Sequence, residues 1–112
     1  MEMIEAVIKP QRLDAVMAAL ARVGVLGLTA MEVKGYGTQA GHTERYRGAK
    51  MDVGFVPKLM LQMVVKSTDR QAVIDAIKEA ANTGQVGDGK IFVFPIGSAV
   101  RIRTGDTGQE AL

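Results

Sequence analysis

The sequence predicts a single α+β domain in which β-strands and α-helices alternate in a doubled strand–helix–strand order. A chain of 112 residues leaves room for one domain. Of these residues 47% are apolar, which is typical of a folded chain with a buried core. Short apolar runs alternate with two segments of helical periodicity. Because only 4% of the residues are aromatic, aliphatic side chains and seven methionines must fill the core.

The first strand–helix–strand unit begins near the N-terminus. Residues 3–9 (MIEAVIK) predict a short apolar strand, and Pro10, which ends it, suits the first turn of a helix. Over residues 13–23 the apolar side chains recur at three- and four-residue intervals, which places them on one helical face. Gly24 ends this helix, and residues 28–36 (LTAMEVKGY) predict the second strand.

The second unit repeats this order after a long polar segment. Residues 58–66 (KLMLQMVVK) predict the third strand. Thr68, followed three residues later by a glutamine, predicts a capping box at the start of the second helix, whose apolar stripe runs to Ala81. After a glycine-rich loop, residues 91–96 (IFVFPI) predict a short fourth strand.

This order is the ferredoxin-like βαββαβ arrangement. Its two helices cover one face of the sheet and leave the other face bare. The third strand contains LMLQMVV, with one polar residue in seven, so it needs apolar cover on both faces. We therefore expect the bare face to be buried against other copies of the chain in a small oligomer.

Composition excludes several classes of protein. There is no cysteine, which rules out disulfides and thiolate metal sites and leads us to expect a cytoplasmic setting. The start, MEMIEAVIKP, does not have the pattern of a signal peptide, and no run approaches the roughly 18 apolar residues of a membrane span. The net charge of +2 permits anionic ligands. Nucleic-acid binding is not expected, because a basic strand with interleaved aromatic residues is absent.

The polar segment from Gly35 to Phe55 (GYGTQAGHTERYRGAKMDVGF) is longer than most loops of compact domains. Segments of this length are usually functional or disordered. The segment holds the single histidine of the chain, His42. One histidine without cysteines makes a poor metal site, so a solvated loop residue is the simpler interpretation.

Residues 84–90 (GQVGDGK) have the G-x4-G-K spacing of a phosphate-binding P-loop. However, Ile91 follows where a P-loop has Ser or Thr, and this loop leaves a helix and enters a strand, the reverse of a P-loop. We reject the P-loop interpretation but retain an anion-binding one. Glycines let successive backbone N–H groups face one anion, and Lys90 adds a positive charge. The alternative is a simple turn before a strand.

A pair of basic residues, Arg101 and Arg103, lies in the segment VRIRTG. In an extended segment, side chains two residues apart point to the same side. Two guanidinium groups on one side would suit a polyphosphate. The alternative is that both belong to a solvated edge strand.

Five motifs together resemble the PII nitrogen-regulatory signal proteins: GHTERYRG, TGQVGDGKIFVF, RIRTG, EAVIKP near the start and EVKGYG before the polar segment. The resemblance spans essentially the whole chain. It implies a single PII domain over residues 1–112, with a T-loop at 37–55, a B-loop at 82–90 and a C-terminal loop at 97–112. It also implies a homotrimer that binds ATP or ADP in the clefts between subunits.

The resemblance also implies which residues form these sites. Those expected to bind the nucleotide are Val7, Gly27, Leu28, Thr29, Gly35, Gly37, Thr38, Gln62, Val64, Gly87, Asp88, Gly89, Lys90, Arg101 and Arg103. The adenine and ribose pocket is expected on one subunit, with both arginines reaching the phosphates from a neighbour. 2-Oxoglutarate is expected to chelate Mg²⁺ beside ATP, with Gln39 as an amide ligand of the metal. Lys58 would pair with its distal carboxylate, close to Gly41 and Gly87.

The T-loop is expected to bind partner proteins through Tyr46, Arg47 and Met51. Arg47 matches the arginine that, in relatives docking on ammonium channels, plugs the exit pore. A nitrogen-metabolism enzyme or kinase is an alternative partner, and membrane contact is expected only through a channel. The ligands are expected to set the shape of the T-loop. Each ligand then shifts partner affinity by the difference in its own affinity for the two shapes.

The chain departs from the family pattern at four positions. Met51 stands where many bacterial relatives carry a uridylylated tyrosine, and Ala49 stands where cyanobacterial relatives carry a phosphorylatable serine. Thr38 replaces an arginine and Gln62 a glutamate, which leaves the local charge about unchanged but leaves the ATP/ADP preference and the 2-oxoglutarate response open. We expect regulation by ligands alone, with Tyr46 as the remaining T-loop tyrosine to test for modification.

Three functions are compatible with these observations. The first is a non-catalytic sensor that regulates nitrogen metabolism. The second is a divergent PII paralogue that senses another metabolite, such as carbonate, or serves a different transporter. The third is a slow ATPase in which Lys90, Arg101, Arg103 and Gln39 stabilise phosphoryl transfer, although Asp88 is the only evident carboxylate near them.

Overall fold

A computed structural model describes residues 1–37 and 54–112 of the chain. Its main elements, in order, are β1 (Glu2–Ile8), α1 (Leu13–Arg22), β2 (Thr29–Tyr36), β3 (Phe55–Val65), α3 (Arg70–Ala81) and β4 (Gly89–Pro95). Short 3-10 helices cover Pro10–Arg12, Ser67–Asp69 and Gly108–Ala111. The predicted βαββαβ order is therefore confirmed. Residues 38–53, which make up most of the predicted T-loop, lie outside the described residues.

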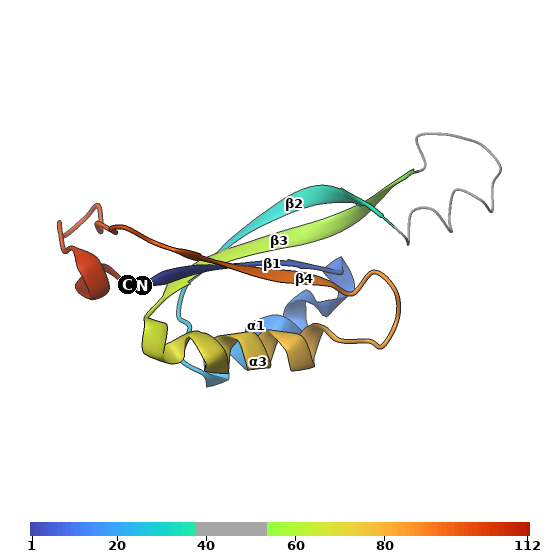
Figure 1. The fold of residues 1–112 in the computed structure, drawn as a ribbon, viewed down its shortest axis with the longest axis horizontal. Coiled ribbons are helices and arrows are strands. Elements are labelled where there is room, and N and C mark those ends of the chain that lie inside the picture. The colour runs from blue at the N-terminus through green and yellow to red at the C-terminus, as the bar shows by residue number, and fades with distance from the viewer. Residues whose placement is uncertain (38–53) are drawn as a thin grey trace.

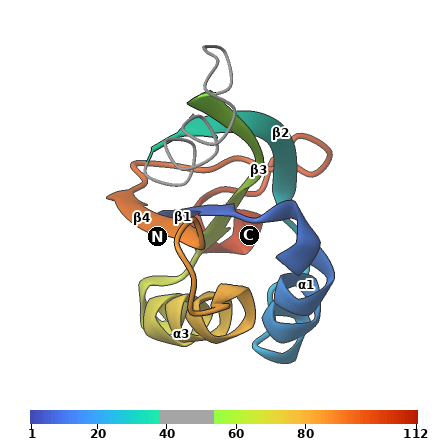
Figure 2. The same ribbon diagram turned by 90° about the vertical axis from the view of Figure 1, so that its right-hand side faces the viewer.

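The four strands form one antiparallel sheet in the order β2-β3-β1-β4 (Figure 1). The register places Ala6 of β1 opposite Leu61 of β3 and Ile91 of β4, and Leu61 opposite Ala30 of β2. Helices α1 and α3 lie side by side on one face of this sheet (Figure 2). The register thus decides which residue of each strand points to the helices.

The hydrophobic core lies between the helices and the sheet. Side chains alternate between the two faces of a strand, so every second residue of β1 and β3 enters this core. In α1, Ala19 and Leu20 are buried three and four residues after Val16, and in α3 the buried residues recur every four positions. The largest fully buried side chains are Ile4, Ile8, Leu61, Val16, Leu20, Val73 and Ile77.

The opposite face of the sheet exposes large apolar side chains. Ile91 pairs with the buried Ala6, so Phe92 and Phe94 point to the other face, where they are 47% and 40% exposed. Met31 of β2 is exposed on the same face. A second copy of the chain would cover these residues, and the oligomer stays a prediction.

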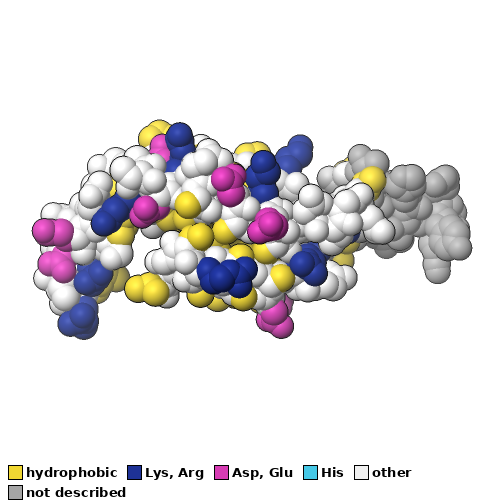
Figure 3. Space-filling view, turned by 90° about the horizontal axis from the view of Figure 1, so that it is seen from below, with side chains coloured by type: hydrophobic (Ala, Val, Ile, Leu, Met, Phe, Trp, Pro, Cys, Tyr) yellow, Lys and Arg dark blue, Asp and Glu magenta, His cyan; other side chains and the backbone are white. Residues whose placement is uncertain are grey.

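The helix side of the molecule has a different character. Lys and Arg side chains are interspersed there with Asp and Glu rather than gathered into one basic patch (Figure 3). No helix within residues 1–37 and 54–112 is long and apolar enough to cross a membrane.

The predicted capping box at the second helix is wrong. Thr68 lies inside the 3-10 turn Ser67–Asp69, and α3 begins at Arg70 without a side-chain hydrogen bond at its N-cap. The 3-10 turn supplies its own backbone bonds instead: the N–H of Asp69 donates to Lys66 O at 2.9 Å, and that of Arg70 donates to Ser67 O. A local backbone turn thus replaced the side-chain cap.

Candidate functional site

A pocket of about 500 Å³ lies at one end of the sheet, where loop 82–88 meets the ends of the strands. Val7 comes from the end of β1, Gly35 from the end of β2 and Lys58 from near the start of β3. Eight residues predicted for the nucleotide or 2-oxoglutarate line this one pocket: Val7, Gly35, Gly37, Lys58, Gly87, Asp88, Gly89 and Lys90. The fold therefore brings these eight residues, which come from segments far apart in the sequence, into one pocket.

The start of β4 approaches the end of β1 unusually closely at Gly89. This residue pairs with Ile8 and has a φ of +110°, a conformation that favours glycine. A Cβ atom added there would lie 1.7 Å from the carbonyl oxygen of Val7. Gly89 and Lys90 are thus the first residues of β4 rather than loop residues, and this contact holds the preceding loop against β1.

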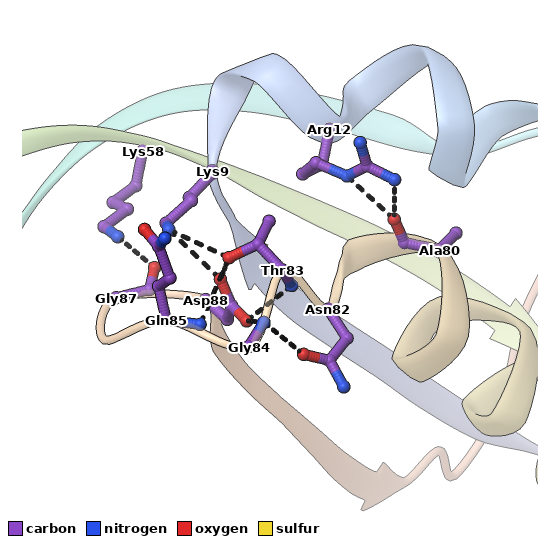
Figure 4. Close-up of polar contacts among 10 residues, drawn as sticks. All are labelled: Lys9, Arg12, Lys58, Ala80, Asn82, Thr83, Gly84, Gln85, Gly87 and Asp88. Carbon is purple, nitrogen blue, oxygen red and sulfur yellow. Dashed lines mark hydrogen bonds and ion pairs between the residues drawn. The ribbon is translucent and has the colours of Figure 1, made fainter.

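Asp88 organises the loop between α3 and β4 (Figure 4). Its carboxylate accepts hydrogen bonds from the backbone N–H groups of Thr83 at 2.7 Å and Gly84 at 3.0 Å. It also accepts one from the Thr83 hydroxyl and forms an ion pair with Lys9 at 3.1 Å. These contacts, led by the Thr83 hydroxyl, hold the pKa of Asp88 well below its usual range. Asp88 is therefore ionised and directed at its own loop.

Lys58 connects β3 to the same loop. Its Nζ donates a hydrogen bond to the carbonyl oxygen of Gly87 (Figure 4). Partial burial and then the charge of Lys9 lower the pKa of Lys58, and Asp88 opposes this shift. Among the described residues, Lys58 and Lys90 line the pocket with Lys9 close by, and Asp88 is the one acidic lining residue, so positive charge exceeds negative charge there. The pocket suits an anion.

The loop also has a fixed starting point. Arg12 donates from Nε at 2.9 Å and from Nη2 at 2.7 Å to the carbonyl oxygen of Ala80, in the last turn of α3 (Figure 4). Carbonyl groups in the last turn of a helix have no intrahelical partner. Arg12 therefore satisfies one of them and holds the end of α3 from which the loop departs.

A second pocket, of about 310 Å³, lies elsewhere on the sheet. The predicted nucleotide residues that line it are Gly27, Leu28, Thr29, Gln62 and Val64. Within it, Gln62 Nε2 donates to Glu5 Oε1 at 3.0 Å, across the β1–β3 pair. Because an ionised carboxylate only accepts hydrogen bonds, Glu5 fixes the amide orientation of Gln62.

The two pockets are separate within one chain. Thr29 and Gly35 belong to the same strand, β2, and are six residues apart. At a rise of about 3.4 Å per residue, this separates them by roughly 20 Å. Within one chain, the residues expected for the adenine and ribose pocket therefore lie in two pockets at different ends of the sheet, and their part in binding a nucleotide stays a prediction.

The two predicted phosphate-binding arginines line neither pocket. Their segment is a turn, closed by the Val100–Thr107 bridge, and not an extended strand. The guanidinium of Arg101 contacts Asp106 Oδ2 at 3.5 Å and Leu112 O at 3.1 Å, whereas Arg103 is exposed. The prediction that both side chains point to one side of an extended segment is wrong for this reason.

Six further predicted site residues lie outside the described residues: Thr38, Gln39, Gly41, Tyr46, Arg47 and Met51. Within residues 1–37 and 54–112, no cluster of three or more His, Cys, Asp or Glu side chains could hold a metal ion. Two residues of the loop network, Lys9 and Thr83, were not predicted. Lys9 immediately follows an apolar strand and precedes a proline. Nothing in this local pattern indicates an ion pair with Asp88, 79 positions further along the chain.

Comparison with known proteins identifies the family. The model of the family described as "Nitrogen regulatory protein P-II" matches residues 1–106. The chain belongs to the P-II family. P-II proteins act in nitrogen regulation and signal transduction, and the relatives of this chain are themselves named nitrogen regulatory proteins. The motif-based resemblance is thereby confirmed.

Several P-II relatives match over their full length. The chain is 52% identical to the nitrogen regulatory protein P-II of Rhizobium meliloti (strain 1021) and 54% identical to that of Rhizobium etli, in both cases over 100% of the two chains. Among solved structures, that of Arabidopsis thaliana PII bound to citrate is similar, with a TM-score of 0.83 and 36% identity. The match covers 99% of this chain and 91% of the other.

Replacing Gly89 by alanine is expected to disrupt the β1–β4 contact. The new methyl group would clash with the Val7 carbonyl oxygen, so Gly89→Ala should lower the free energy of unfolding by about 3 kcal/mol or more, measured by urea denaturation. Gly97→Ala is the matched control, because a Cβ at Gly97 meets no atom within 4 Å. It should change stability by less than about 0.5 kcal/mol. Equal stability of both variants would contradict the described approach of the strands.

Replacing Gln62 by glutamate is expected to place two carboxylates opposite each other across β1 and β3. Such a pair costs about 0.2–1 kcal/mol. Each carboxyl group would hold its proton more tightly in the folded state than in the unfolded one. The loss of stability should therefore be present at pH 8 and disappear as the pH falls toward about 4.

Thermal melts at both pH values would measure this effect. The double variant Glu5→Gln, Gln62→Glu keeps one donor and one acceptor, so it should recover the stability of the wild type at pH 8. A single variant that is as stable as the wild type at pH 8 would show that the two side chains do not meet.

Proposed function

We propose that this P-II protein binds ATP or ADP in clefts completed by neighbouring subunits of a homotrimer, and that the bound ligand sets the affinity of its T-loop for a partner protein. The observation that carries the proposal is the division of the predicted nucleotide residues between two pockets roughly 20 Å apart on β2. A single nucleotide can contact both sets of residues if the larger pocket of one subunit lies against the smaller pocket of its neighbour.

The larger pocket has the chemistry of a phosphate site. Glycines at positions 84, 87 and 89 have positive φ, which turns the backbone around the pocket. Lys90 lines it and supplies a positive charge. Backbone N–H groups together with a lysine suit a polyphosphate, so we assign the triphosphate of ATP, or the diphosphate of ADP, to this end.

The smaller pocket has the chemistry of a base site. Leu28 and Val64 supply apolar surface for a planar ring. Thr29 and Gln62 supply hydroxyl and amide groups that pair with the polar edge of the ring. Gln62 Nε2 donates its hydrogen bond to Glu5, so the Oε1 of Gln62 remains as an acceptor. This oxygen can accept a hydrogen bond from an exocyclic amino group. Adenine carries such a group.

2-Oxoglutarate and Mg²⁺ are proposed to join ATP in the larger pocket. Magnesium commonly takes one or two protein ligands together with phosphates, which fits a chain that offers Gln39 as a single amide ligand. Lys58 would pair with the distal carboxylate, close to Gly41 and Gly87. Since Lys58 donates to the carbonyl of Gly87, the arriving carboxylate would compete for the same ammonium group.

The partner-binding part of the proposal concerns Tyr46, Arg47 and Met51 of the T-loop. An ammonium channel, or an enzyme or kinase of nitrogen metabolism, is the expected class of partner in the cytoplasm. β2 and β3 carry this segment between Tyr36 and Phe55, whose rings are 5.6 Å apart. The pocket residues Gly35, Gly37 and Lys58 stand at the same end of these strands, which supports a link between ligand and loop.

An ATPase is less well supported. Asp88, the one carboxylate among the described residues that line the proposed phosphate site, already binds Thr83, Gly84 and Lys9. A general base needs a free acceptor within reach of the attacking water.

Light scattering combined with calorimetry tests the proposed function. The protein should have three times the chain mass of 12.0 kDa and should bind one ATP or ADP per subunit. In the presence of Mg²⁺ and ATP it should also bind 2-oxoglutarate. Lys90→Met should weaken ATP binding by about tenfold or more, since it removes a phosphate-binding charge. A monomer that binds neither nucleotide would overturn the proposal.

A further inference from the structure

We propose that Lys9 is a positioning residue for the phosphate-binding loop, which acts through Asp88 and controls affinity for the phosphates rather than for the base. This inference rests on the proposed nucleotide-binding function. It concerns a residue outside the predicted site, at the end of β1, whose side chain reaches both ends of the loop.

The loop is closed on itself by one carboxylate. Asp88, at the end of the loop, accepts from the backbone N–H groups of Thr83 and Gly84, which stand at its start. The N–H of Gly84 also donates to Asn82 Oδ1 at 2.7 Å, and the N–H of Gln85 donates to the Thr83 hydroxyl at 3.3 Å. Every one of these bonds lies within residues 82–88, so they shape the loop but do not attach it to the sheet.

Two lysines attach the loop to the sheet: Lys58 of β3 donates to Gly87 O in its middle, and Lys9 contacts its two ends. The Nζ of Lys9 lies 3.1 Å from Asp88 Oδ1 and 3.3 Å from Thr83 Oγ1, so one ammonium group binds both ends of the loop (Figure 4).

The side chains of Lys9 and Asp88 are only 14% and 23% exposed. An ion pair sheltered to this extent is screened less than a surface pair. Gly89, next to Asp88, pairs with Ile8, next to Lys9, so backbone and side chains hold the same junction.

The attached loop leaves donors for an anion. Among the described residues, the backbone N–H groups of Val86 and Gly87 have no hydrogen bond to the protein, and both residues line the large pocket. Gly87 has a φ of +94°, which turns the chain at this point. Consecutive unpaired N–H groups at a glycine turn form a concave anion site. Their direction depends on where the two ends of the loop are held.

Lys9 also balances the charge of Asp88. A carboxylate beside a polyphosphate repels it, and the repulsion grows with the number of phosphate charges. With Lys9 in place, Asp88 forms a neutral pair and the charge of Lys90 remains for the ligand. Loss of Lys9 would therefore free the two ends of the loop, which Lys58 holds only at Gly87, and leave an uncompensated negative charge beside the phosphates. Both effects weaken ATP more than ADP, and ADP more than AMP.

Calorimetry with ATP, ADP and AMP on the full chain tests this inference. Lys9→Met should lower ATP affinity by about tenfold or more, ADP affinity by less, and AMP affinity least. Lys9→Arg keeps the charge and should recover most of the ATP affinity. Arg22→Met removes the same charge from an exposed position at the end of α1 and should leave all three affinities unchanged.

The outcomes separate this inference from the function on which it rests. Wild-type protein that binds no nucleotide overturns the proposed function. If the wild type binds ATP, two results would overturn the proposed role of Lys9 and leave the proposed function standing. One is that Lys9→Met has the same nucleotide affinities as the wild type, and the other is that it loses affinity for ATP, ADP and AMP by the same factor. If thermal melts show that Lys9→Met does not fold, Lys9→Gln, which keeps a donor and loses the charge, is measured instead with the same expected order of losses.

Discussion

The antiparallel pairing of β4 with the end of β1 is the constraint on which the site depends. It brings Gly89 so close to the Val7 carbonyl oxygen that there is no room for a Cβ atom. This contact fixes the place at which the loop from α3 enters the sheet. Asp88 and Lys9 meet because their neighbours, Gly89 and Ile8, are paired partners. The basic pocket at this end of the sheet is thus a consequence of strand register as much as of loop composition.

The same sheet divides the predicted nucleotide-binding residues of one chain between two pockets. The register of β2 with β3 places Thr29 opposite Gln62 and Gly35 opposite Val56, so the base-like and phosphate-like pockets occupy different ends of one strand pair. The face that carries Gln62 also exposes Phe92 and Phe94. The proposed association of identical chains would cover this apolar face and would also bring the two pockets of neighbouring copies together.

Periodicity was enough to predict the elements and their order, because each helix and strand buries one face at its own repeat. The sequence could not predict contacts that depend on distant partners. Lys9 finds Asp88 only after β1 and β4 pair. Thr68 does not cap the second helix, because the backbone N–H groups there form hydrogen bonds within a 3-10 turn. Arg101 and Arg103 do not lie on an extended segment, because a turn closed by the Val100–Thr107 bridge takes its place.

The central claim is that a nucleotide binds where two copies of the chain meet, and mixed oligomers test it most directly. Lys90→Glu reverses a charge in the phosphate-like pocket, and Thr29→Trp fills the base-like pocket. Each variant alone should bind no ATP. Co-expressed with separate tags and purified through both, the two variants should form mixed trimers with one intact cleft each and regain ATP binding. Mixed oligomers that bind no better than either parent would show that the site does not lie between subunits.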